Sequence, residues 1–561
     1  MILRQKHIIL GTAVLLGAMT LIVHGSALKG EWRADDPWII LYVTEHPEAW
    51  RYFFSPGQWQ SLGVPFFTPW LTLEYWLDFH LFGFKPVGFY AHHLISLWCA
   101  AVLTFILLYR RVGVFGAGAA ALFFLAGSPV VVVSQQLMSR HYVTGLVFTL
   151  LAILFYLRAR ERESRPSLAL AAVCYLVAML NKEIFAPLPL VLFFLDKATY
   201  KERLYAIAPF GFVAGGYIFW RSVMLGAIIG GYGGNRLHEA RNIIASIHAL
   251  LEVIWGANLV LAGSMVLLLV IGLQVVREPR MRPLLAPSLV ALLLPLLAIR
   301  ITPNVFDFRL GLLPWWGICV MLSWVYVGFG NRLLWKICCF SFLGVIIGMH
   351  TFSTQKSYKE IADAYDVQGN FLRSHPQRHG YIPSGNVRSD ISFQYATSAL
   401  RSAVGGGAPV AVPFVESRDL LGSPSPILYY ENSCGCMEIM ENEKDIVGSP
   451  QRTAVAPLLQ AVFFDRTKDG LIWEFSVPKN SSCFLLFPLL NISAQIPCNG
   501  QIFFNPPSWL QGELRVLTHT NAGQWDSSPI LKFPGKGGQV QWHKDSSVGS
   551  VPQAIQQQYD H

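Results

Sequence analysis

Two adjacent carboxylates, Asp35 and Asp36, follow the first long apolar run of the chain and stand directly before a proline. A carboxyl group that is partly removed from water has a raised pKa and can take a proton from a hydroxyl group, which is general-base chemistry. The plainer interpretation is structural, because Asp followed by Pro is a common helix start. Both are candidate catalytic residues. We favour capping for Asp36, at a helix that begins at Pro37, which leaves Asp35 as the preferred base.

Three other short stretches place a charged pair beside an apolar run: Arg140–His141, Lys182–Glu183 and Asp307–Arg309. Ionisable groups at the edge of a membrane-spanning segment are costly and usually face a partner or a cavity. Taken singly, each is explained by a local ion pair or by a cation that reaches the lipid phosphates. Together, three cations on the same side as an acidic pair predict an anionic, phosphate-bearing ligand that enters from the outer leaflet.

The composition shows which elements must position these residues. Of the 561 residues, 53% are hydrophobic and only 14% are charged, and the mean hydropathy is +0.42. A soluble domain has about 25% charged residues, so a plain soluble enzyme, a disordered scaffold and a disulfide-framework protein are excluded. Apolar runs broken by short basic clusters indicate a polytopic α-helical membrane protein. We expect eleven spans, near 7–28, 87–109, 112–133, 142–157, 168–181, 184–196, 204–222, 251–276, 283–300, 311–329 and 336–352.

The basic residues predict the orientation of these spans. If the N-terminus is in the cytoplasm, the cytoplasmic side of residues 1–352 has 16 basic residues (Lys and Arg) and 5 acidic residues (Asp and Glu). The outer side has 11 basic and 11 acidic residues. This is the asymmetry that the positive-inside rule expects. The two short spans 168–181 and 184–196 are predicted to form a helical hairpin with Lys182 and Glu183 at its tip. The basic residues are scattered over short loops and form no continuous stripe, which excludes nucleic acid as a partner.

The first outside segment, 29–86, is rich in aromatic residues: 16 of its 58 residues are Phe, Trp or Tyr. Segments of this kind lie along the membrane interface as amphipathic helices. We therefore expect interfacial helices that cover a cavity between the bilayer and water.

Residues 353–561 differ in character from the rest of the chain. They hold 16 basic and 18 acidic residues and no apolar run long enough to span a membrane. After a mixed stretch over 355–430, short β-rich runs such as LIWEFSV, CFLLFPLL, GQIFF, ELRVLTH and PILKFP alternate with Gly, Pro and Asn. This pattern predicts an extracytoplasmic accessory domain that is mixed at first and then β-sandwich-like.

The N-terminal part of the chain, with the acidic pair and the charged residues described above, resembles the GT-C superfamily of membrane glycosyltransferases, in particular protein O-mannosyltransferases and lipid A aminoarabinose transferases. The resemblance runs in order over residues 1–352, from the DD pair through FFTPWLTLEYWLDFHLFGFKPVGFYAHHLI, SRHYVTGLVFTLLAILFYLRAR, LNKEIFAPLPLVLFFLD and FDFRLGLLPWWGICVML. It implies a GT-C-like transmembrane catalytic domain over this range. The chain departs from the family in having SRHY where relatives often have Gly-Arg, and a β-rich tail in place of tetratricopeptide repeats.

The resemblance implies an inverting transfer of a sugar from a polyprenyl-phosphate-linked donor to an extracytoplasmic protein hydroxyl, lipid or glycan. Asp35 would be the general base. The leaving phosphate needs positive charge, which is the role expected of Arg140, Lys182 and Arg309. The orienting residues would be Glu183, Asp307 and His141. We expect no protein-bound metal site and no certain cofactor, although Mg²⁺ or Mn²⁺ stays open.

We expect an integral, multi-pass protein of a bacterial inner or cell membrane. Two functions other than glycosyl transfer are alternatives. A transporter or flippase of lipid-linked sugars needs charges in both leaflets and often has inverted repeats. The gathering of charge on one side favours the enzyme. A catalytically inactive GT-C scaffold is the other alternative, and the intact acidic pair argues against it.

Overall fold

The computed structural model describes residues 2–62, 66–195, 198–226, 240–255, 305–328 and 333–374, together with twelve short strands beyond residue 379. The chain separates into two compact units. The first, here called the helical unit, comprises residues 1–30, 46–60 and 64–362. The second unit comprises residues 31–45, 61–63 and 363–561.

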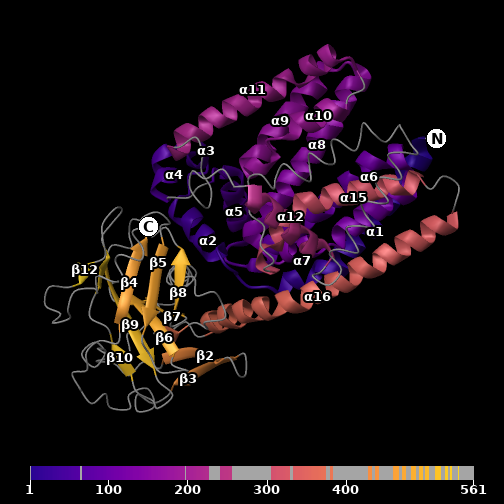
Figure 1. Ribbon diagram of the computed structural model, residues 1–561. Helices are drawn as coiled ribbons and strands as arrows, with labels where there is room; N and C mark the ends of the chain where they lie inside the picture. The colour runs from indigo at the N-terminus through magenta and orange to yellow at the C-terminus, as the bar shows by residue number, and fades with distance from the viewer. Residues whose placement is uncertain are drawn as a thin grey trace. The chain divides into compact units, whose positions relative to one another are not determined.

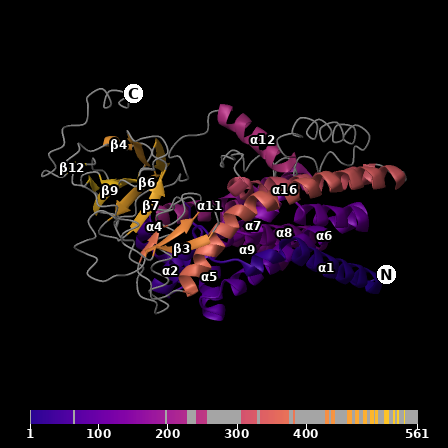
Figure 2. The same cartoon turned by 90° about the horizontal axis from the view of Figure 1, so that it is seen from below.

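Long apolar helices form the core of the helical unit. In the described part of the chain, four helical stretches are long and apolar enough to cross a membrane: Gln5–Lys29, Pro86–Leu125, Leu137–Arg162 and Lys336–Asp363. Helices α1 (Ile2–His24), α8 (Arg140–Arg162) and α15 (Leu312–Gly328) all pack against α6 (Pro86–Leu125), and Figures 1 and 2 show α1, α6 and α8 close together in both views. The chain is therefore a multi-pass helical membrane protein. The eleven crossings stay a prediction, because the predicted spans near 251–276 and 283–300 fall largely outside the described residues.

Helix α6 joins two of the predicted spans into one 40-residue run with a break at Gly113. Gly113 has φ 78° and ψ 173°, a conformation that glycine adopts without the steric cost of a Cβ atom. The break lies just after Arg110 and Arg111, where the sequence predicts a loop. The second segment ends at Leu125, and the short helix α7 (Ser128–Ser134) follows it.

The predicted hairpin is present as α9 (Arg165–Asn181), the 3₁₀ turn η3 (Glu183–Phe185) and α10 (Leu188–Leu195). Lys182 stands between α9 and η3 in an extended conformation, and its backbone N–H donates to the carbonyl of Ala178. A Cβ atom at Gly145 of α8 would lie well inside contact distance of the Phe185 ring. Glycine at that position therefore lets the turn after Lys182 approach α8 closely.

Short helices follow the first span, as the aromatic-rich segment predicts: α3 (Arg51–Phe54), α4 (Pro56–Leu62) and α5 (Pro69–Phe82). Aromatic rings of this segment pack against α11 (Tyr200–Leu225): the ring centroid of Trp220 lies 5.6 Å from that of Phe67, which precedes α5. The Trp220 indole N–H also donates to the carbonyl of Phe53 at 2.9 Å. The segment from α3 to α5 is thus fixed against the end of α11.

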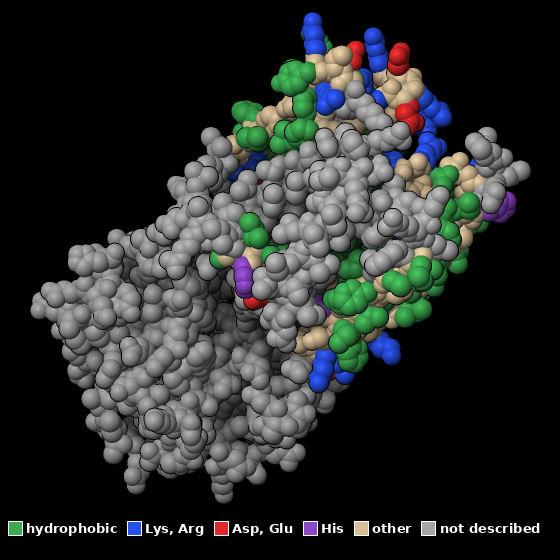
Figure 3. Space-filling model, turned by 45° about the vertical axis from the view of Figure 1, so that its right-hand side comes forward, with side chains coloured by type: hydrophobic (Ala, Val, Ile, Leu, Met, Phe, Trp, Pro, Cys, Tyr) green, Lys and Arg blue, Asp and Glu red, His purple; other side chains and the backbone are tan. Residues whose placement is uncertain are grey.

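The surface of the helical unit separates apolar from basic side chains. Exposed apolar residues cover the long helices, among them Leu10 and Ile22 of α1, Phe212 of α11 and Phe352 of α16 (Leu333–Ser374). Figure 3 shows a surface of apolar side chains between Lys and Arg side chains, most of which lie at the upper end and a few at the lower edge. An apolar exterior of this kind suits contact with lipid tails.

The second unit contains α2 (Asp36–Glu45), the last turns of α16 and the strands, and α16 runs without interruption across the predicted domain boundary at 352–353. Strand β6 (Ser482–Phe487) pairs antiparallel with β7 (Ile492–Ile496) and β9 (Gly512–His519). These belong to a six-stranded sheet of order β12–β11–β9–β6–β7 with β10 on β9, and two three-stranded sheets have the orders β1–β2–β3 and β4–β5–β8. The other strands are β1 (Gly380–Ile382), β2 (Ile427–Glu431), β3 (Cys436–Met440), β4 (Leu459–Asp465), β5 (Gly470–Phe475), β8 (Asn499–Phe503), β10 (Trp525–Ser527), β11 (Leu531–Phe533) and β12 (Gln541–Trp542). The β-rich runs predicted from the sequence therefore form strands, whereas their packing as a sandwich stays a prediction.

Candidate functional site

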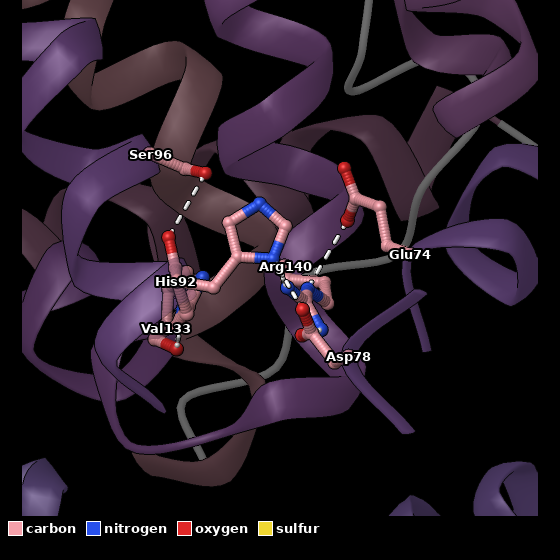
Figure 4. Close-up of polar contacts among 7 residues, drawn as sticks. Glu74, Asp78, His92, Ser96, Val133 and Arg140 are labelled. Atoms are coloured by element: carbon pink, nitrogen blue, oxygen red, sulfur yellow. Dashed lines mark hydrogen bonds and ion pairs between the residues drawn. The ribbon is translucent and has the colours of Figure 1, made fainter. Parts of the chain in front are cut away.

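Four ionisable residues of the helical unit form a buried cluster, here called the Arg140 cluster: Glu74, Asp78, His92 and Arg140. Glu74 and Asp78 are four residues apart on α5 and so share one face of the helix. The Arg140 guanidinium donates from Nη1 to Asp78 Oδ2 at 2.6 Å, and its Nε lies 3.1 Å from Glu74 Oε2. Figure 4 shows both carboxylates turned to the guanidinium. The exposed fractions of the three side chains are only 1%, 1% and 5% for Arg140, Asp78 and Glu74.

His92 of α6 is the most exposed member of the cluster. Its Nδ1 lies 2.7 Å from Asp78 Oδ1 and 2.8 Å from Arg140 Nη2. One ring nitrogen either donates or accepts, so at any moment Nδ1 bonds the carboxylate or the guanidinium, and not both. Burial raises the pKa of Glu74, although Arg140 acts in the opposite direction.

These contacts bear on the expectation that Arg140 binds a phosphate. The structure gives its guanidinium two carboxylate partners and almost no exposed surface. Arg140 thereby ties the start of α8 to α5, and a contact between Arg140 and a phosphate stays a prediction. Sequence reasoning missed Glu74 and Asp78, whose spacing of four residues within an apolar segment was the available signal.

Lys182 lies in a different environment, against aromatic rings. Its ammonium is 3.4 Å from the ring centroid of Phe66 and 5.8 Å from that of Tyr142, distances typical of cation–π contacts. No carboxylate of the described residues lies within ion-pair distance of this ammonium. Burial is the main cause that lowers the pKa of Lys182 to about 8; Arg309 lowers it further and Glu183 opposes the shift.

Glu183 was expected to orient Lys182, and the structure gives its carboxylate another partner. Arg221 of α11 donates from Nε to Glu183 Oε1 at 2.5 Å, and the backbone N–H of Phe67 approaches the same oxygen at 3.4 Å. Arg221 was not identified from the sequence, although an arginine within the apolar run 204–222 was the available signal. Glu183 thus connects the hairpin tip to α11 and to the segment before α5.

Arg309 lies on the 3₁₀ helix η6 (Val305–Gly311). Its Nη1 donates to Gln136 Oε1 at 3.1 Å, and its Nη2 is 3.9 Å from Asp307 Oδ1, the partner that the sequence suggests. Lys182 and Arg309 interact electrostatically with each other and with His141 of α8. Lys182 and Arg309, with the His141 ring on which both act, are here called the cationic group and belong to three separate elements. Burial and these two cations favour the neutral form of the His141 imidazole.

The acidic pair belongs to the second unit. The backbone carbonyl of Asp35 accepts from the N–H of Ile39, so α2 begins at Asp36, one residue earlier than predicted. The fully buried Asp36 accepts from the backbone N–H of Arg33 at 2.9 Å, whereas Asp35 is half-buried. The pairing of Asp35 with the cationic group stays a prediction, because the two belong to different units.

The loop before the acidic pair is held by a bidentate ion pair within the second unit. Arg33 donates from Nε to Asp366 Oδ1 at 2.9 Å and from Nη2 to Asp366 Oδ2 at 2.6 Å. The backbone N–H of Glu31 donates to the same carboxylate at 2.9 Å. Between Arg33 and the pair, Ala34 has a positive φ of 48°. Asp366 of α16 thereby fixes the loop that carries Asp35.

The chemistry that this arrangement suits is the binding of an anion. A buried ammonium with no described carboxylate at ion-pair distance and a guanidinium offer positive charge, and together with the neutral imidazole they offer N–H donors that match phosphate oxygens. Within the described ranges, no three His, Cys, Asp or Glu side chains are grouped so that they could hold a metal ion.

No protein-family model matches the sequence, and no curated protein matches it. Among solved structures, the chain is similar to the crystal structure of ArnT from Cupriavidus metallidurans bound to undecaprenyl phosphate. The TM-score is 0.43 at 14% sequence identity, over 75% of this chain and 94% of that chain. The apo crystal structure of the same protein gives a TM-score of 0.40 at 13% identity, over 71% of each chain. The chain is thus similar in structure to ArnT over about three quarters of its length, at low sequence identity.

Proposed function

We propose that this protein is a membrane glycosyltransferase that moves a sugar from a polyprenyl-phosphate carrier to an extracytoplasmic acceptor. The observation that carries the proposal is the cationic group, in which the buried ammonium of Lys182 interacts with Arg309 and His141 and no described carboxylate lies within ion-pair distance of it. A buried ammonium without a described carboxylate at ion-pair distance is costly, so a ligand that supplies negative charge is favoured there. The phosphate of a lipid carrier has that charge.

The proposed reaction is a single displacement at the anomeric carbon. Asp35, the base implied by the resemblance to the GT-C superfamily, takes the proton of the acceptor hydroxyl. The hydroxyl oxygen attacks the anomeric carbon, the bond from that carbon to the phosphate oxygen breaks, and the configuration inverts. The electron pair leaves with the lipid phosphate, whose charge Lys182 and Arg309 stabilise.

The proposal includes the orientation of the chain. The N-terminus lies in the cytoplasm, and the reaction takes place on the other side, where residues 353–561 form an accessory domain. The positive-inside asymmetry of the loops supports this orientation.

The experiment uses the full chain in lipid nanodiscs with a panel of polyprenyl-phosphate sugars. Asp35→Asn keeps the shape of the side chain and removes the base, so turnover should fall by roughly 10²–10⁴-fold while donor binding is retained. Lys182→Ala should weaken donor binding and turnover together, because the phosphate is charged before and after the reaction.

Asp36→Asn is the matched control for the acidic pair. An inactive Asp36→Asn with a nearly normal Asp35→Asn would show that the roles of the two acids are reversed. If neither substitution has an effect while lipid-linked sugar still crosses the membrane, the protein is a transporter and the glycosyltransferase proposal fails.

A further inference from the structure

Glu183 follows Lys182 directly in the chain, and yet its carboxylate contacts Arg221 of α11. The two partners are largely buried, with exposed side-chain fractions of 7% for Arg221 and 23% for Glu183. An ion pair at this degree of burial is held firmly, because the loss of either partner leaves an uncompensated charge.

Arg221 is held in place by its neighbours on the same helix. Tyr217 of α11 donates from its hydroxyl to the carbonyl of Phe67 at 3.3 Å, and the Trp220 indole N–H donates to the carbonyl of Phe53. The backbone N–H of Phe67 points to the Glu183 carboxylate as well. The position of this carboxylate is thus set by α11 and the segment before α5.

The ammonium of Lys182 remains against Phe66 and Tyr142. The charged and titratable groups that act on it are Glu183, Arg309 and His141. Of these, only Glu183 is an acid, and it is engaged elsewhere.

We propose that Arg221 is a positioning residue that holds the Glu183 carboxylate away from Lys182 and thereby keeps the Lys182 ammonium available to an anionic phosphate ligand. The identity of the ligand rests on the proposed function, whereas the electrostatic coupling of Arg221, Glu183 and Lys182 does not.

The coupling is tested by the reactivity of Lys182 toward an amine-acylating reagent, followed by mass spectrometry over pH 6–10 on the full chain in detergent. In Arg221→Met, the released Glu183 carboxylate should pair with Lys182 and stabilise its protonated form. The midpoint of labelling should then rise by about one pH unit, which is about a fivefold loss of neutral amine at pH 8 and about a tenfold loss at pH 6–7. Arg203→Met, on the same helix but bonded to the carbonyl of Ala198, is the control and should leave the midpoint unchanged.

A double-mutant cycle separates an action through Glu183 from a direct effect of the Arg221 charge. In a Glu183→Gln background, Arg221→Met should leave the midpoint within about 0.3 units, because no carboxylate remains to be released. An equal upward shift in both backgrounds, or no shift in either, would overturn the proposal. If Arg221→Met does not fold, Glu183→Gln alone still tests it: the phosphate affinity should be retained or increased, and a loss would show that Glu183 supports Lys182 directly.

Binding of undecaprenyl phosphate in nanodiscs tests the consequence for the ligand. Arg221→Met should weaken binding about tenfold, and the Arg221→Met, Glu183→Gln double variant should restore it to within about threefold of wild type. Failure of the double variant to recover would mean that Arg221 contacts the phosphate itself. If the wild-type chain does not bind undecaprenyl phosphate although the labelling cycle is as expected, the proposed function fails and the assignment of Arg221 stands.

Discussion

Removal of the Arg140 guanidinium should destabilise the helical unit strongly. Arg140 is 1% exposed and neutralises two carboxylates whose side chains are 1% and 5% exposed. Deleting one partner of a buried ion pair costs about 3–5 kcal/mol, because the remaining charge is left in a medium that cannot solvate it. For Arg140→Met, which keeps most of the apolar volume, we expect a loss of at least this size in the free energy of unfolding.

The assay is reversible unfolding in mixed micelles, with Arg110→Met as the control. Arg110 lies 3.9 Å from Glu161 with both side chains more than 60% exposed, so its loss should cost about 0–1 kcal/mol. The combined variant Arg140→Met, Glu74→Gln, Asp78→Asn should recover part of the stability, since it removes the uncompensated charges. Equal losses for Arg140→Met and Arg110→Met would refute the reasoning.

The pH dependence of the same variant gives a second check. Burial raises the pKa of Glu74 above its ordinary 4.5, and Arg140 counteracts this. A carboxyl group with a raised pKa in the folded state favours folding below its unfolded pKa and loses that contribution as the pH rises through the folded pKa. Because the pKa should rise further in Arg140→Met, the deficit relative to wild type should shrink on acidification from neutral pH toward 4.5. A deficit independent of pH would contradict this account.

Two further predictions concern topology and the loop of the acidic pair. Reporter fusions at residues 165, 203 and 282 should read cytoplasmic and one at 420 extracytoplasmic; a cytoplasmic signal at 420 would imply an even number of spans and would remove the proposed site from the outer face. Asp366→Asn should lower turnover with little change in donor binding, because Arg33 loses its bidentate partner and the loop that carries Asp35 is no longer fixed. A control at the exposed neighbour, Asp363→Asn, should keep full turnover, and normal turnover in Asp366→Asn would show that the ion pair does not position the base.

The sequence predicts those elements that rest on local patterns. Apolar runs and the basic residues between them predict the helical hairpin around Lys182 and an interruption of α6 at Arg110 and Arg111, close to the break at Gly113, since span length and basic clusters are local properties. The β-rich runs of the tail predict strands such as β6 and β9 for the same reason. The charged pairs that contain His141, Lys182 and Arg309 stand out because ionisable residues are rare in such runs. In the structure these three residues act on one another electrostatically, whereas Arg140 and Glu183 pair elsewhere.

The partners of these residues could not be predicted in this way. Arg33 and Asp366 are 333 positions apart, and no pattern within either segment indicates the other. Glu183 and Arg221 are 38 positions apart on different elements, so the adjacent lysine looked like the natural partner of the glutamate. Pairings of this kind depend on how helices pack, which is a property of the tertiary structure.

Gly145 has a consequence for how a survey of tolerated substitutions in this protein should be interpreted. Any larger residue there would meet the buried ring of Phe185, and relief would require a shift of the turn that carries Lys182. A mutational scan should therefore find position 145 as intolerant as a reacting group, although glycine has no side chain to offer. Intolerance at this site would reflect the close packing of the turn that carries the Lys182 ammonium. Such data alone would suggest a catalytic role for Gly145, whereas the residue only provides space for Phe185.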